Sequence, residues 1–186
     1  MLSGRLPTRC LLVLGGLIIA AQAGMAQVLN STARPIALNA TLAESVSVTL
    51  SASSVNFILT SGSASNPGST NITSTMTWTL RPSRGTLSLY AFFASSTAAL
   101  TDGVGDNIPS SAFSISDNAG PFNPLVNTVP FGGANAGLTL TTIRILGFNK
   151  TGTHTDDMRF NINLTSLPSL PPGTYTGTLT IQAQAI

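Results

Sequence analysis

Residues 70–80 read TNITSTMTWTL, and threonine or serine separates most of their apolar side chains. The apolar positions keep a period of two: Ile72, Met76, Trp78 and Leu80. Successive side chains of a β-strand point to opposite faces, so this period is typical of a strand that buries one face and exposes the other. The stretch therefore predicts a half-buried strand, with Trp78 in the core rather than on an exposed, sugar-stacking surface.

The same alternation recurs in six further runs of the chain: 36–42, 46–50, 55–59, 113–115, 158–164 and 175–185. Residues 138–145 also alternate, but their phase slips by one residue, which predicts a β-bulge. Residues 87–93 are apolar on both faces, which is typical of a central strand.

Clusters of Gly, Pro, Asn, Asp and Ser separate these runs, and no stretch after the first 26 residues has helical periodicity. Short strands with regular turn signals predict an all-β protein. We expect a single antiparallel, Ig-like Greek-key β-sandwich of about eight or nine strands over residues 36–186, with a closed β-barrel as the alternative. Residues 27–35 are expected to form a flexible leader.

The first 26 residues have the three parts of a secretory signal peptide. Arg5 and Arg9 supply positive charge, residues 11–21 form a short apolar segment, and small residues offer cleavage after Ala26 or Ala23. The apolar segment is shorter than the roughly 20 residues that span a bilayer. We expect residues 1–26 to be cleaved and the protein to be exported to the periplasm, the cell surface or the medium, with no transmembrane segment in the mature chain.

Charged residues make up only 8% of the chain, against about 25% in an average soluble protein. The formal net charge is +2, but Arg5 and Arg9 lie in the predicted signal peptide. Beyond residue 26, six basic and six acidic side chains balance, so the exported chain is close to neutral. This balance leaves no basic surface of the kind that binds nucleic acid.

No set of nucleophile, base and metal ligands predicts an enzyme or a bound cofactor. The only cysteine, Cys10, precedes the apolar segment, so the exported chain has neither thiol chemistry nor disulfides. His154 is the only histidine, which excludes a three-histidine zinc site, and no serine lies in a G-x-S-x-G motif. We expect residues 152–157, GTHTDD, to form a polar hairpin loop whose histidine and acids face water.

The loop at 102–107, DGVGDN, carries three oxygen-bearing side chains: Asp102, Asp106 and Asn107. Calcium takes about six to eight oxygen ligands, and glycine-rich loops can wrap around it, so the loop is a weak calcium candidate. Its spacing does not match the EF-hand pattern, and Asp-Gly pairs are common in ordinary turns. A plain turn is therefore the alternative.

Residues 172–181 read PGTYTGTLTI and resemble the closing strand of bacterial exported pilin-like sandwiches, including the spore coat protein U domain and small fimbrial-type domains. The resemblance rests on six positions: Pro172, Gly173, Tyr175, Gly177, Leu179 and Ile181. In such a strand the Pro-Gly pair forms the entering turn, Tyr175 anchors the start in the core, and Gly177 permits a close approach or a bulge. The chain departs from these families in having no cysteine pair in its exported part and no aromatic residue next to its end.

The resemblance implies a non-enzymatic structural or adhesive subunit of a bacterial surface appendage or coat. Such subunits act by strand addition, so the expected partners are other subunits, of the same or a fimbrial type, together with a periplasmic chaperone where assembly is assisted. The candidate donor strand is 36–42, through Ile36, Leu38, Ala40 and Leu42; alternatively, this segment is the first strand of its own molecule. A secreted monomeric module that binds carbohydrate or calcium is the alternative function.

Overall fold

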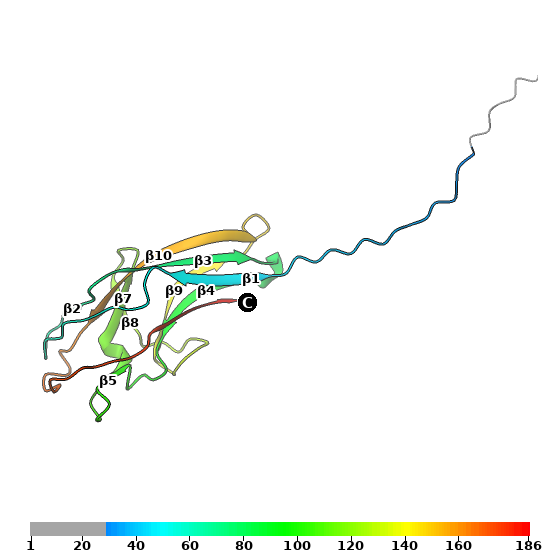
Figure 1. The fold of residues 1–186 in the computed structure, drawn as a ribbon. Coiled ribbons are helices and arrows are strands. Elements are labelled where there is room, and N and C mark those ends of the chain that lie inside the picture. Colours follow the sequence, from blue (N-terminus) through cyan, green and yellow to red (C-terminus); the bar gives the residue numbers. More distant parts are fainter. Residues whose placement is uncertain (1–28) are drawn as a thin grey trace, which may run out of the picture. The chain divides into compact units, whose positions relative to one another are not determined.

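The computed structural model describes residues 29–186, so the predicted signal peptide lies outside the described residues. The chain divides into a unit that ends at Ala40 and a compact unit, Thr41–Ile186. Every strand pair of the compact unit is antiparallel (Figure 1). The only helical elements among the described residues are two 3-10 turns, η1 (Pro82–Arg84) and η2 (Ser110–Ala112). The prediction of an all-β, antiparallel protein is confirmed.

The strands form three sheets. The largest has six strands, in the order β1 (Ser45–Leu50), β3 (Ile72–Thr79), β10 (Thr151–Ile162), β7 (Phe113–Asp117) and β8 (Phe122–Pro124), with β2 (Asn66–Pro67) also paired to β10. The second has three strands, in the order β11 (Thr180–Ala185), β4 (Thr86–Phe92) and β9 (Gly137–Arg144). A small third sheet contains β5 (Leu100–Thr101) and β6 (Asn107–Ile108).

β3 has the alternation that its sequence predicts, with its even-numbered side chains buried. Trp78 is only 6% exposed, and its indole N–H donates a hydrogen bond to the backbone carbonyl of Asn149 at 2.9 Å. Gly152 on β10 lies against the indole ring and leaves no room there for a Cβ. Trp78 is therefore a core residue, as predicted.

The two larger sheets share two hydrophobic clusters, so the core lies between them. The tryptophan cluster consists of Met76, Trp78, Leu80, Leu87, Leu89 and Ile145. The phenylalanine cluster contains 14 buried residues, among them Ile72, Ala91, Phe93, Phe113, Ile115, Met158, Phe160 and Ile162.

β4 is the central strand of its sheet and is buried on both faces, as residues 87–93 predict. The predicted bulge is also confirmed. Leu89 pairs with Thr141 whereas Tyr90 pairs with Thr139, so Leu140 is the extra residue of β9.

Three predicted strands differ in the structure. Residues 36–42 form no strand, and β1 begins only at Ser45. Residues 55–59 contain only an isolated bridge, between Phe57 and Gly68. The last strand begins at Thr180 rather than at Tyr175. These segments alternate as strands do, but a strand also needs a neighbour that satisfies its backbone groups.

The segment 152–157 was predicted wrongly as a loop, because it lies within β10. Its threonines face outward while His154 and Asp156 occupy the inward positions, in phase with Met158. Asp156 is fully buried. The alternation is real, but polar side chains at the inward positions hid it.

Candidate functional site

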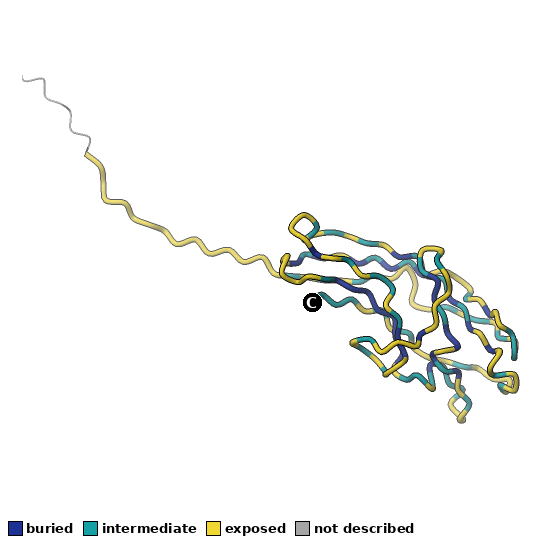
Figure 2. The backbone as a smooth tube through the Cα atoms, turned by 180° about the vertical axis from the view of Figure 1, so that it is seen from behind, coloured by how far each residue is buried: buried dark blue, intermediate teal, exposed yellow. Residues whose placement is uncertain are grey.

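The described residues before β1 are exposed (Figure 2), and their large apolar residues stand at alternate positions. Ile36 is 82% exposed, Leu38 is 90% exposed and Leu42 is 83% exposed. Ala40 shares their alternating phase, and Asn39 occupies the opposite one. Single exposed apolar residues are ordinary on protein surfaces. Several of them on one side of an extended segment make a face suited to a partner. We call residues 29–42 the tail.

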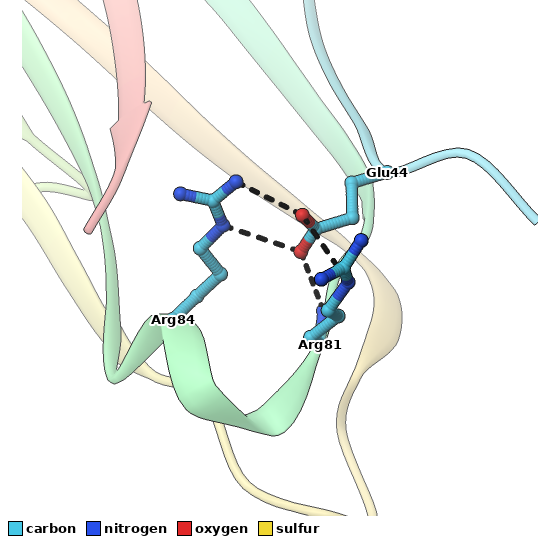
Figure 3. Close-up of polar contacts among 3 residues, drawn as sticks. All are labelled: Glu44, Arg81 and Arg84. Carbon is cyan, nitrogen blue, oxygen red and sulfur yellow. Dashed lines mark hydrogen bonds and ion pairs between the residues drawn. The ribbon is translucent and has the colours of Figure 1, made fainter.

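Glu44 fixes the point where the tail joins β1 (Figure 3). Its carboxylate accepts hydrogen bonds from the Arg84 guanidinium at 2.9 and 3.2 Å and from the Arg81 backbone N–H at 2.8 Å. The bonds from Arg84, followed by the one from Arg81, lower the pKa of Glu44 to about 2. The C-terminus lies at the same end of the compact unit. Ile186 exchanges two backbone hydrogen bonds, each at 3.0 Å, with Thr86, which follows Arg84 by two residues.

A groove opens at the opposite end, between the segments that continue β1 and precede β11. Residues 50–59 form one wall and residues 173–181 form the other. Its floor belongs to the phenylalanine cluster: Ile72, Phe93, Phe113, Met158, Phe160 and Ile162. The groove has a volume of about 610 Å³.

The walls of the groove are extended segments with few backbone partners. Ser69 donates its backbone N–H to the carbonyl of Asn56 at 2.8 Å, so the peptide groups of Val55 and Phe57 turn away from Ser69. On the other wall, Thr176 exchanges two backbone hydrogen bonds with Thr101, each at 2.9 Å. Within residues 29–186, Gly177 makes no backbone hydrogen bond. A strand laid between the walls would meet free peptide groups on both sides.

The residues of the pilin-like motif build the second wall. Pro172 and Gly173 lie in an exposed turn, and the half-buried Tyr175 donates its hydroxyl hydrogen bond to the carbonyl of Pro171 at 2.9 Å. Gly177 lies so close to the carbonyl of Ala99 that a Cβ would collide with it. Leu179 and Ile181 pack against the phenylalanine cluster.

The loop at 102–107 uses its first carboxylate to hold a turn. Asp102 Oδ1 accepts backbone hydrogen bonds from Val104, Gly105 and Asp106 at 2.9, 3.1 and 3.0 Å. These bonds, that of Val104 first, lower the pKa of Asp102. The Asn107 amide donates to the carbonyl of Gly105 at 3.2 Å. No group of three or more His, Cys, Asp or Glu side chains in residues 29–186 is arranged to hold a metal ion.

Sequence reasoning missed a polar cluster around the fully buried Asp156. Asp156 Oδ1 lies 2.9 Å from His154 Nε2 and 3.2 Å from the Asn118 side-chain amide, and the carboxyl of Asp117 lies nearby. The signal that could have found Asp156 is its phase, since it continues the inward face of Met158 and Phe160.

Comparison with protein-family models, with curated proteins and with solved structures finds no match for this chain. The described residues contain no helix with the length and apolar character that a membrane crossing requires. The fold defines the class as an all-β protein with antiparallel sheets, and no family is identified.

Proposed function

We propose that this protein is a non-enzymatic, exported structural or adhesive subunit of a bacterial surface appendage or coat, built as an Ig-like, pilin-like β-sandwich whose copies join by strand pairing. One observation carries the proposal: the same chain has an open groove with strand-like walls and a tail whose alternate large side chains are exposed.

The tail and the groove match in length and chemistry. Residues 36–42 are seven residues long, which corresponds to about 23 Å of extended chain. The walls offer stretches of the same length, 53–59 and 173–179. Alternate apolar side chains would enter the groove while Asn39 and its odd-numbered neighbours face outward. Full burial of each large side chain contributes about 1.5–3 kcal/mol.

The short connection between the tail and β1 favours insertion of the tail into the groove of another copy over insertion into the groove of its own molecule. If the tail folded back at residues 43–44, it would run beside β1 and place Ile36 next to Ser51. The groove only begins at this point, so residues 36–42 would lie outside it. The space beside β1 is also taken, because β1 packs next to β11.

The positions of donor and acceptor favour a head-to-tail chain of subunits. The tail joins the compact unit beside Thr86 and Ile186, whereas the groove lies beyond the other ends of β1 and β4. A contact between two different surfaces of the same protein forms a ring or an open filament rather than a closed two-fold dimer. The low charge of the chain suits such self-association, since few charged side chains protect its sheet edges.

The experiment compares two arginine substitutions on neighbouring tail residues. Leu38→Arg places a charge on the face that enters the groove, whereas Asn39→Arg places the same charge on the outward face. Light scattering over a range of protein concentrations should show oligomers for the native chain and for Asn39→Arg, and monomers for Leu38→Arg.

A native chain that stays monomeric at every concentration would contradict this function and favour the secreted monomeric binding module. Equal loss of assembly in both variants would show that the tail does not bind through one face.

A further inference from the structure

A buried polar layer, formed by Ser74 and Asp156, lies between the two core clusters on β3 and β10. On β3, Ser74 lies between Ile72 of the phenylalanine cluster and Met76 of the tryptophan cluster. Asp156 of β10 pairs in register with Ser74, and both residues are fully buried. Burying a carboxylate is costly unless hydrogen bonds or a charge partner compensate it. The partners of Asp156 therefore decide how far the cost of burying its carboxyl group is offset.

The partners of Asp156 come from its own strand and from the turn after β7. His154 Nε2 and the Asn118 side-chain amide both reach Oδ1 of Asp156, at 2.9 and 3.2 Å. Asn118 has a left-handed backbone, with φ of 48°, and its side-chain oxygen accepts the backbone N–H of Asp157 at 3.0 Å. The turn between β7 and β8 is thus bound to β10 beside the buried carboxylate.

Two carboxylate oxygens of the layer have no hydrogen-bond partner: Oδ2 of Asp156 and Oδ1 of Asp117. The two carboxyl groups lie on the same inward face of neighbouring strands, because Asp117 pairs with Met158 and Asp156 shares the phase of Met158 on β10. Two ionised carboxylates that share a buried site repel, whereas a single proton lets one carboxyl donate to the other. Burial, followed by the charge of Asp156, raises the pKa of Asp117 to about 6.

The other groups that face this pair are mostly neutral. β3 supplies the Ser74 hydroxyl, and β9 supplies the Thr141 hydroxyl, 3.5 Å from His154 Nε2. Among residues 29–186, His154 is the only basic side chain within 4.0 Å of the carboxylate of Asp117 or Asp156. Arg159 and Asp157 occupy the opposite phase of β10, where Arg159 donates to Ser116 Oγ at 3.0 Å.

We propose that Asp117 keeps a proton in the folded domain and donates it to the buried Asp156, which His154 contacts from the other side, and that this layer makes the domain sensitive to pH. In mildly acidic medium the proton joins β7 to β10. When it leaves, the repulsion between the carboxylates loosens the β7–β8 turn. This inference is independent of how copies of the chain assemble.

The direction of the pH effect is set by the raised pKa of Asp117. A carboxyl whose folded-state pKa is raised binds its proton more tightly in the folded state than in the unfolded state. Its contribution to stability is fully present below the unfolded pKa, about 3.9, and is lost as the pH rises through about 6.

The test follows the melting temperature of the full chain between pH 4.5 and 8. Asp117→Asn supplies an amide that can donate to Asp156 at every pH, in place of the shared proton. We expect the melting temperature of the native chain to fall between pH 5 and pH 7.5. The variant should show a smaller fall and should melt at or above the native temperature at pH 7.5. Asp157→Asn is the matched control, since it removes a carboxylate from the opposite face of β10 and should leave the pH dependence unchanged.

Carboxyl ¹³C resonances of the aspartates give a second readout that does not depend on stability. One resonance should titrate near pH 6 in the native chain and be absent from Asp117→Asn. The proposal is overturned if every aspartate titrates near the ordinary value of about 3.9, or if Asp117→Asn keeps the native pH dependence. A rise in melting temperature on adding calcium chloride at pH 7.5, abolished by Asp117→Asn, would also overturn it, because a cation would then occupy the layer.

Discussion

β1 and β11 have paired neighbours at one end of the compact unit, whereas the segments that adjoin them at the other end have few. At the end where the tail joins, β1 pairs with β3, β11 pairs with β4, and the tryptophan cluster lies between the sheets. At the other end, the segments 51–59 and 173–179 leave those neighbours and a groove opens over the phenylalanine cluster. At the first end the strands of the chain itself cover the core. At the second end the groove has room for one more strand. This contrast supports the proposal that the missing strand comes from another copy.

Deletion of residues 175–186 should have the largest effect, because it opens the closed end as well. It removes β11 and leaves one edge of β4 without a partner, which is costly for buried backbone groups. We expect an insoluble product, or a product without a cooperative melt, by circular dichroism.

Deletion of residues 29–40 is the control for this truncation. It removes twelve residues that make no strand, and the compact unit should melt as the native chain does. A soluble, cooperatively folded protein that lacks residues 175–186 would show that β11 is peripheral.

Substitutions in the tryptophan cluster and on the groove wall should differ severalfold in the free energy of unfolding that they cost. Trp78→Ala should lower the free energy of unfolding by about 3–5 kcal/mol, as truncation of a large core aromatic does. Val55→Ala, on the groove wall, removes two methyl groups from a half-exposed site and should cost about 1 kcal/mol. Urea unfolding measures both values. Equal costs would mean that the groove wall is packed as tightly as the closed end.

Two glycines of the second wall sharpen the comparison on a smaller scale. A Cβ at Gly177 collides with the carbonyl of Ala99, whereas a Cβ at Gly173 has its nearest neighbour at 3.7 Å. Gly177→Ala should therefore destabilise the domain by about 1–3 kcal/mol, the usual cost of forced overpacking, and Gly173→Ala should be close to neutral. Urea midpoints of the two variants check this, and a neutral Gly177→Ala would show that the wall is free to move.

The smallest effect is expected at Glu44, where the tail joins β1. Since the folded-state pKa of Glu44 is lowered to about 2, its contribution is present above the usual value of 4.5 and is lost as the pH falls through about 2. The melting temperature of Glu44→Gln should approach that of the native chain between pH 4.5 and pH 2. The difference in melting temperature between the two proteins reports on Glu44 alone, because both proteins contain Asp117, whose contribution to stability changes with pH in the opposite direction. A constant difference down to pH 2 would contradict the assignment of this pKa to Glu44.

The fold class could be predicted because the inward positions of most strands are apolar. Residues 70–80 and 87–93 are examples, and the phase slip in residues 138–145 located the bulge of β9. The strand over 152–157 was missed because His154 and Asp156 occupy the positions where apolar residues were expected. A strand with polar side chains at its inward positions still alternates with a period of two, but the sequence shows no alternation of apolar and polar residues.

The candidate site could be predicted only in part, because strand pairing is not a local property. Residues 36–42 and 175–179 alternate as regularly as β3 does, and nothing within them shows whether a neighbouring strand is present. The resemblance singled out residues 172–181 as a closing strand, and the structure places residues 173–181 in one wall of the groove. The other wall, 50–59, became recognisable only when the fold placed it opposite the first.

The most direct test of strand donation between copies is a disulfide trap. The chain has no cysteine after Cys10, so Leu38→Cys on the tail and Val55→Cys in the groove wall are unique sites in the exported protein. Two differently tagged copies, each with one of these substitutions, are mixed and oxidised. We predict a disulfide-linked pair that contains both tags. Asn39→Cys, on the outward face of the tail, should form far less of this product with Val55→Cys. Absence of the mixed pair, or an equal yield from Asn39→Cys, would contradict insertion of the tail into the groove of another copy.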